Sequence, residues 1–139
     1  MAVQLEELQE IWLHLRAHVD QLADERQHYQ EFFERSSEAY VLTDAYGTIG
    51  EVNGAAVDIL QRRKRYLRGK PLAALIALER RAEFRRNMSA LLARAPGSQA
   101  AWRSIVVAPG ERTDVLFTGR VIARSAHIGG ICWRLESLT

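Results

Sequence analysis

The 139-residue chain has one cysteine, three prolines and no long apolar run. A single cysteine excludes an internal disulfide and a thiolate metal cage, and it favours a cytoplasmic protein. No apolar stretch approaches the ~20 residues that span a bilayer, and no basic-then-apolar leader opens the chain, so we expect no membrane segment. No Gly-rich phosphate loop or nucleophile motif is present. The sequence therefore offers no candidate catalytic or metal-binding residue, and we do not expect an enzyme.

The composition is that of a globular protein, with 47% hydrophobic and 26% charged residues. These fractions exclude wholesale disorder. The net charge of +2 is unevenly divided, because residues 1–35 hold eight carboxylates against three arginines, a charge of −5. Residues 36–139 hold sixteen basic against nine acidic residues, a charge of +7. This asymmetry predicts an N-terminal region over 1–35 and a second domain over 36–139.

The N-terminal region has the pattern of a long amphipathic helix. Between Leu5 and Phe33 there is neither proline nor glycine, and good helix formers dominate. Apolar residues recur at alternating steps of three and four, which is the seam of a left-handed coiled coil. A helix packed only on its own domain is the alternative. We expect a homodimer, parallel or antiparallel, whose seam contains Leu5, Leu8, Trp12, Leu15, Val19, Leu22 and Tyr29, with Arg26 as its charged member.

The second region alternates strand-like runs and helices. Asp44 and Gly47 are expected in a turn between strands over 40–43 and 48–52, and Asn53 is expected to cap a helix over 54–60. A longer helix is expected over 79–94. Further strands are expected at about 101–108, 114–124 and 128–136, with turns at 109–110 and 125–130.

The middle of these three strands has apolar residues on both faces. Val115, Phe117, Val121 and Ala123 share one face, whereas Leu116 and Ile122 fall on the other. A sheet with a partly apolar outer face needs a cover, and we expect the amphipathic N-terminal helix to supply it.

Three motifs follow one another in the second region: Asp44-Ala-Tyr-Gly47-Thr-Ile49, Asn53-Gly-Ala-Ala56 and Gly69-Lys-Pro-Leu72. In this order they resemble the PAS family. The resemblance implies an α+β fold, with a five-stranded antiparallel sheet and helices on one face, preceded here by the long helix. PAS domains sense ligands, light or redox state, or dimerise, and pass the signal to kinases, cyclases or transcription regulators. From the residues themselves we expect Asp44, Gly47, Asn53 and Gly69 to be structural.

Cofactors with strong signatures are disfavoured. Haem-binding relatives use a histidine on the long helix, and residues 79–94 contain none. Photoactive flavin domains use a helical cysteine, whereas Cys132 falls on the last expected strand and is best explained as a small buried hydrophobe. His14 and His18 lie four residues apart but lack a third ligand, so we expect them to be solvated.

The interior between sheet and helices is the candidate ligand pocket. Its expected lining is Val41, Thr43, Ile59, Leu60, Leu75, Phe84, Trp102 and Phe117. These side chains either fill the core completely or leave room for a small apolar ligand.

An Arg-rich segment over 62–86 carries ten positive charges. It is explained as a solvated face, or as the surface of a ligand-independent adaptor that binds a protein or nucleic acid. Nucleic acid is disfavoured because no recognised binding motif accompanies the charge.

The favoured function is a PAS-type sensory and dimerisation module of a bacterial signal-transduction, two-component or transcription-regulatory system, with an output domain or signalling protein as partner. The sensor part of a histidine kinase or cyclase is one form of this.

Overall fold

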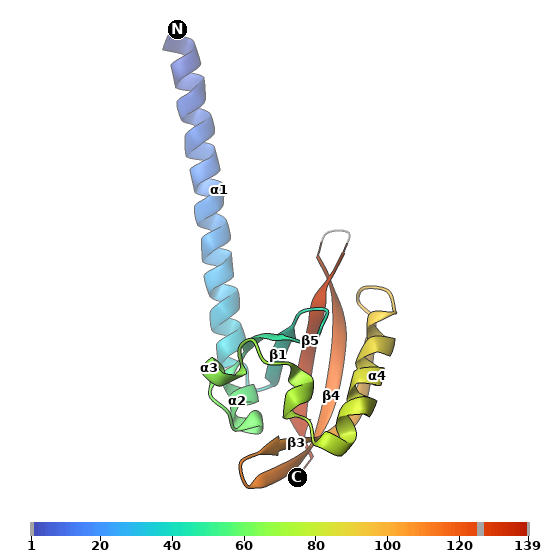
Figure 1. The fold of residues 1–139 in the computed structure, drawn as a ribbon. Coiled ribbons are helices and arrows are strands. Elements are labelled where there is room, and N and C mark those ends of the chain that lie inside the picture. Colours follow the sequence, from blue (N-terminus) through green and yellow to red (C-terminus); the bar gives the residue numbers. More distant parts are fainter. Residues whose placement is uncertain (1, 125–126, 139) are drawn as a thin grey trace. The chain divides into compact units, whose positions relative to one another are not determined.

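The computed structural model describes residues 2–124 and 127–138, which form two compact units, Met1–Phe33 and Glu34–Thr139. The first unit is almost all of the α1 helix, Ala2–Arg35, shown in blue in Figure 1. The uninterrupted helix agrees with the absence of proline and glycine over this stretch. Among the helices described, none combines the length and the apolar composition needed to cross a membrane.

The second unit contains a five-stranded antiparallel sheet, as expected from the sequence. The strands are β1 (Ala39–Thr43), β2 (Ile49–Val52), β3 (Gln99–Ala108), β4 (Glu111–Arg124) and β5 (His127–Ser137). Their order in the sheet is β2-β1-β5-β4-β3, so the first strand in the chain pairs with the last. The sheet is therefore held together by contacts between the two ends of this unit.

The connections between β2 and β3 are helical and lie on one face of the sheet (Figure 1). They comprise α2 (Gly54–Leu60), α3 (Lys64–Leu67), the 3-10 turns η1 (Leu72–Leu75) and η2 (Leu78–Arg80), and α4 (Arg81–Leu92). The helix expected over 79–94 is thus shorter, because its first residues form a 3-10 turn. Its end agrees with the Pro96-Gly97 pair that follows.

Alternation along the strands separates a buried face from a more exposed one. On β4, Val115, Phe117 and Val121 are buried under the helices. Ala123, which we expected on the same face, is exposed. Ala123 lies beyond Arg120, the last residue of β4 that pairs with β3, and there the pairing of β4 with β5 is also irregular, with an extra residue on β5. Of the turn expected at 125–130, residues 125–126 lie outside the described part of the chain.

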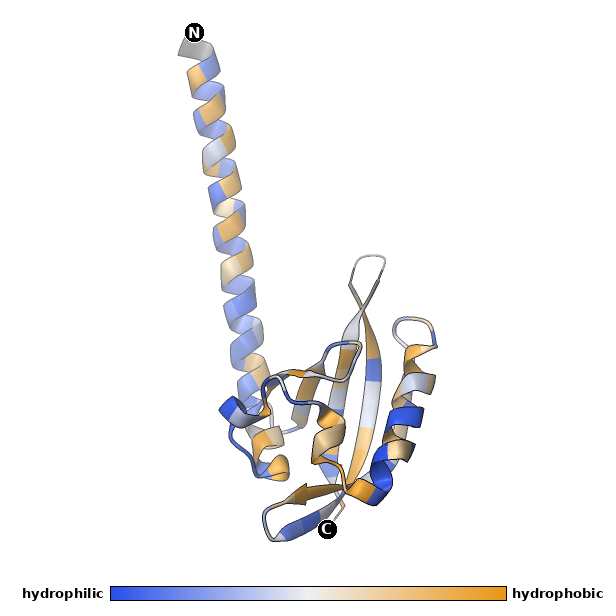
Figure 2. Cartoon of the chain, viewed as in Figure 1, coloured by the Kyte–Doolittle hydropathy of each residue, from blue (hydrophilic) through white to orange (hydrophobic). Residues whose placement is uncertain are grey.

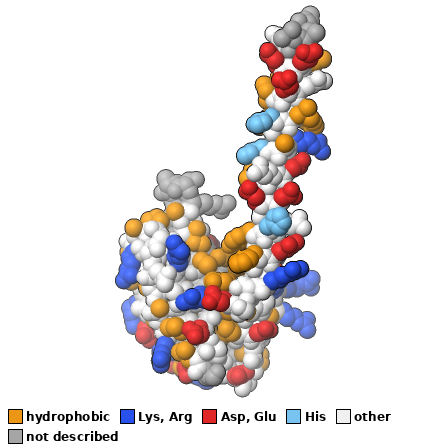
Figure 3. Space-filling model, turned by 180° about the vertical axis from the view of Figure 1, so that it is seen from behind, with side chains coloured by type: hydrophobic (Ala, Val, Ile, Leu, Met, Phe, Trp, Pro, Cys, Tyr) orange, Lys and Arg blue, Asp and Glu red, His pale blue; other side chains and the backbone are white. Residues whose placement is uncertain are grey.

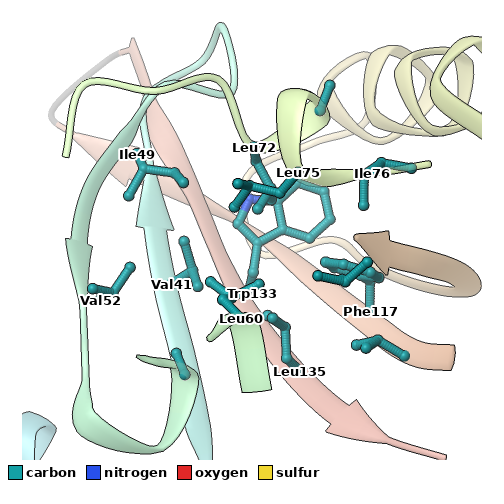
Figure 4. Packing of buried hydrophobic residues seen from close by; sticks show 14 of the residues in the cluster. Val41, Ile49, Val52, Leu60, Leu72, Leu75, Ile76, Phe117, Trp133 and Leu135 are labelled. Carbon is teal, nitrogen blue, oxygen red and sulfur yellow. The ribbon is translucent and has the colours of Figure 1, made fainter. Parts of the chain in front are cut away.

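The hydrophobic core lies between the sheet and the helices (Figure 4). Its largest fully buried side chains are Trp133, Phe84 and Phe117. The opposite face of the sheet is partly apolar, with partly exposed Leu42, Leu116 and Cys132, so Cys132 is only partly buried and not the buried residue that we expected. That the N-terminal helix covers this second face remains a prediction.

Candidate functional site

The apolar stripe of α1 is the first candidate site. All seven residues of the expected seam are exposed, by fractions between 51% for Leu22 and 63% for Leu8. Exposed leucine, valine and tryptophan on one helix represent a large unburied apolar area, which is uncommon on a soluble monomer. An apolar face of this size calls for a surface that covers it.

The stripe is wider near the N-terminus than the seam alone. Ile11 and Leu13 lie outside the two seam series and are 57% and 61% exposed. A shallow groove between side chains on this part of the helix is lined by Leu5, Leu8, Gln9, Trp12 and Leu13. In Figure 2 apolar bands are frequent along the N-terminal half of α1, and a mostly hydrophilic stretch follows them. Leu13 was missing from the seam expected from the sequence, although its spacing from Leu5 and Gln9 already puts it beside that seam.

The interior of the second unit is the second candidate. Of the eight side chains expected to line a pocket, the seven hydrophobic ones lie in the core or pack against it, and the eighth, Thr43, is also buried. The ring centroid of Phe84 lies 5.1 Å from that of Phe117, 5.5 Å from that of Trp133 and 5.6 Å from that of Trp102. Rings at these separations are in contact. Four aromatic side chains therefore occupy the centre of the space that we treated as a pocket.

Trp133 was missing from our expected lining, although it is the largest of the fully buried side chains. The alternation Ile131, Trp133, Leu135 on the last strand was a signal that could have placed it there. Its indole Nε1 donates a hydrogen bond of 3.0 Å to Thr43 Oγ1, which satisfies the one buried hydroxyl on β1. Thr43 is thus explained by its partner rather than by a ligand.

The indole of Trp102 differs in this respect. Its Nε1 is buried and has no hydrogen-bond partner in the described part of the chain. Trp102 packs edge-on against Trp133, with 5.5 Å between ring centroids, so the unpaired donor lies beside the aromatic cluster. A buried N–H without an acceptor costs about 1–3 kcal/mol.

A groove of about 550 Å³ lies where β1 and β5 meet α2. Its floor is apolar, from Ala39, Ala55, Ile59 and Leu135, and its polar rim consists of Ser37, Glu38, Asp58, Arg134, Glu136 and Ser137. Of the expected pocket residues only Ile59 borders it. At the rim, Tyr40 Oη donates a 2.6 Å hydrogen bond to the Glu38 carboxylate, and this bond together with partial burial raises the pKa of Tyr40.

The four residues expected to be structural occupy turns and a helix cap. Asp44 Oδ1 accepts hydrogen bonds from the backbone N–H groups of Tyr46 and Thr48, at 2.8 and 2.9 Å. Gly47 and Gly69 adopt φ values of +82° and +81°, which favour glycine. At Gly47 a Cβ would also approach Met88 Sδ to 3.0 Å.

Asn53 is fully buried and does more than cap α2. Its Oδ1 accepts hydrogen bonds from Ala56 N at 3.0 Å and from Tyr40 N at 2.9 Å, and its Nδ2 donates to Glu38 O at 2.8 Å. One side chain therefore joins the start of α2 to the start of β1. Cap preference alone predicts the first of these bonds, and only the tertiary structure brings β1 to the same side chain.

The Arg-rich segment is divided by the fold. α3 packs against β2 at one edge of the sheet, whereas α4 packs against β3 and β4 at the other. Several of its charges have partners: Lys64 pairs with Glu34, and Arg68 pairs with Glu51 at 3.2 Å. The Arg81 guanidinium donates to backbone carbonyls of η1 and the residue after it. The single basic surface expected over 62–86 is thus two separate ones, because the η1 segment between them crosses the unit.

Next to α3, two cationic side chains lie over one aromatic ring. Arg62 and Lys70 each lie 5.1 Å from the centre of the half-exposed Tyr66 ring. Such cation–π contacts hold the cations in place. Among the described residues, no group of three or more His, Cys, Asp or Glu side chains is placed to hold a metal ion.

Comparison with known proteins identifies the fold family. A family model described as PAS fold matches residues 27–136, which is most of the chain. The chain belongs to the PAS family. Among curated proteins, none matches this sequence. PAS domains are sensory modules and are generally non-catalytic, so the coarse function of residues 27–136 is sensory.

Solved PAS structures support the same fold. The PAS domain of an HTR-like protein from Haloarcula marismortui is 14% identical, covers 88% of this chain and 99% of its own, and superposes with a TM-score of 0.73. The PAS domain of a LuxR-family transcriptional regulator from Burkholderia thailandensis, solved with ethanol, is 24% identical, with coverages of 79% and 96% and a TM-score of 0.63. A domain of a putative light- and redox-sensing histidine kinase from Haloarcula marismortui is 22% identical, with coverages of 81% and 99% and a TM-score of 0.61.

Proposed function

We propose that this protein is a cytoplasmic PAS signalling module that works as a homodimer joined through α1. The observation that carries the proposal is the exposed apolar seam from Leu5 to Tyr29. Seven large side chains left in water on one helix face are stabilised when an equivalent face covers them. A change in the PAS unit that altered the pairing of two such helices would pass a signal to a partner.

The names of similar proteins agree with a regulatory role. A LuxR-family transcriptional regulator and a histidine kinase each contain a domain with the same fold. We infer a two-component or transcription-regulatory setting for this chain, with an output domain or a separate signalling protein as its partner.

The test replaces two seam leucines with a charged residue. In the variant Leu15→Glu/Leu22→Glu, carboxylates would occupy the dimer seam, and burying them costs several kcal/mol. We expect sedimentation at micromolar concentration to change from dimer to monomer, while the β-rich circular dichroism signal is kept. The control Ala17→Glu/Gln21→Glu adds the same charge on an exposed side of the helix away from the seam. It should remain dimeric.

Two results would contradict the proposal. If the seam variant stays dimeric, the dimer contact lies elsewhere, for example on the outer sheet face. If the seam variant unfolds as a whole, α1 is part of the core of its own domain.

A small ligand in the core is a second candidate, supported by the unpaired Nε1 of Trp102. A ligand oxygen accepting from this N–H would remove the cost of the unsatisfied donor. The Burkholderia thailandensis PAS domain was solved with ethanol, a molecule of this kind. Native mass spectrometry of the purified protein should then show a bound small molecule that is lost in Trp102→Phe. A wild-type spectrum without additional mass would contradict this candidate.

A further inference from the structure

In the N-terminal half of α1 the apolar stripe extends past the seam on both sides, to Ile11 on one edge and to Leu13 on the other; we call the Leu13 side, which also carries Gln9, Glu6 and Arg16, the second face. At about 100° per residue, the side chains from Ile11 round to Leu13 cover an arc of roughly 200°, whereas Val19 to Tyr29 cover only about 80°. Both end residues of the wide arc are more than half exposed. Apolar side chains accordingly lie on both edges of the upper part of the helix in Figure 3.

A single partner helix cannot bury an arc of this width. In a two-stranded coiled coil each helix buries a narrow seam of two positions in seven. Helices that are apolar over about half their circumference occur in bundles, where they contact two or more neighbours. The narrow arc over 19–29 fits a dimer, so the additional contact is confined to the first half of α1.

The second face of α1 can pack against the same face of a second copy of the helix. Leu13 stands at one end of the groove whose other lining residues are Leu5, Leu8, Gln9 and Trp12. These four are centred between residues 8 and 9 of the helix. In an antiparallel pair, Leu13 of each helix can enter the groove of the other, level with residues 8 and 9 of that helix. Any two residues at the same level then have numbers that add up to about 22. Because this sum is the same for either helix, both Leu13 side chains can enter a groove at once.

Charge complementarity supports the antiparallel direction. Glu6 and Arg16 lie about 40° to either side of the line midway between Gln9 and Leu13. In the antiparallel register Glu6 of one helix is level with Arg16 of the other, and the two opposite charges share one layer of the contact. Arg16 already lies over the Trp12 ring, 5.2 Å from its centre. A parallel pairing would put each charge level with its own copy, which is repulsive.

We propose that two dimers of this protein associate through the N-terminal halves of α1, forming an antiparallel four-helix bundle over residues 5–16. The occupant of the second face is a second copy of the same helix. This inference rests on the helix-mediated dimer proposed above, and it adds a tetramer that forms as protein concentration rises.

The test measures assembly state by sedimentation equilibrium of the full chain, from micromolar to submillimolar concentration. Wild type should pass from dimer to tetramer. Leu13→Glu should remain a dimer over the same range, with dimer–dimer association weakened by at least about tenfold. The control His14→Glu places a carboxylate on the side of the helix opposite the middle of the apolar arc, and it should assemble like wild type.

A charge exchange tests the direction of the helices. Arg16→Glu should weaken tetramer formation, and Glu6→Arg/Arg16→Glu should restore it, because the exchanged charges again face each other. Failure of the exchange to restore the tetramer would contradict the antiparallel register.

The remaining outcomes separate this inference from the proposed dimer. If wild type stays dimeric at every concentration, or if Leu13→Glu still forms tetramers, the proposed contact between dimers is wrong. The proposed dimer is unaffected by either result. A monomeric Leu13→Glu variant also overturns it, because Leu13 would then belong to the dimer seam. A wild type that is monomeric throughout contradicts the dimer itself.

Discussion

Replacement of Asn53 by alanine tests how β1 is joined to α2. The side chain hydrogen-bonds with Ala56 N, Tyr40 N and Glu38 O, and the residue is fully buried. At about 1 kcal/mol for each hydrogen bond, Asn53→Ala should lower the free energy of unfolding by about 3 kcal/mol. Loss of a helix cap alone would lower it by only about 1 kcal/mol.

Asp44 provides a matched control. Its carboxylate also accepts two backbone hydrogen bonds, from Tyr46 and Thr48, but the residue is exposed. Water can replace the lost partner there, so Asp44→Ala should cost about 0.5–1 kcal/mol. Both variants are measured by urea unfolding, with dimer formation followed in parallel and the slope m compared with wild type.

The difference in unfolding free energy between Asn53→Ala and Asp44→Ala shows whether the bonds of Asn53 to β1 contribute to stability. If Asn53→Ala costs no more than Asp44→Ala, the bonds to β1 contribute nothing and Asn53 is only a cap. If Asn53→Ala keeps full stability but loses a bound small molecule, the residue belongs to a ligand site.

Three further predictions concern single residues. Arg26→Leu removes the charge from the α1 seam and should tighten the dimer roughly tenfold by sedimentation, whereas an unchanged dissociation constant would place Arg26 outside the contact. Gly119→Ala should lower stability by about 1–3 kcal/mol in urea unfolding, because the new Cβ would lie 2.8 Å from Leu91 Cδ2 and 3.0 Å from Trp133 Cζ3; a neutral effect would mean that the core yields easily. Burial raises the pKa of the Cys132 thiol, so alkylation of the folded protein should reach half its maximal rate above the usual pH of about 8.5, and a midpoint below that value would contradict the burial.

The local elements follow from the sequence alone, because the interactions that cause them are between near neighbours in the chain. Thirty-four residues without proline or glycine form the uninterrupted α1 helix. Asp44 and Gly47 form the turn before β2, and Asn53 precedes α2 as its cap. Alternation of period two marked the three long strands, although their first residues were missed; at β4 the charged residues at the start of the strand hide the pattern.

Contacts between distant residues could be read only from the folded chain. Strand β1 lies beside β5, so Thr43 meets Trp133, which is 90 positions away in the sequence. The same strand order carries α3 and α4 to opposite edges of the sheet and divides a charge run that is continuous in the sequence. Contacts of this kind depend on how the whole chain closes on itself, and no pattern within one element contains that information.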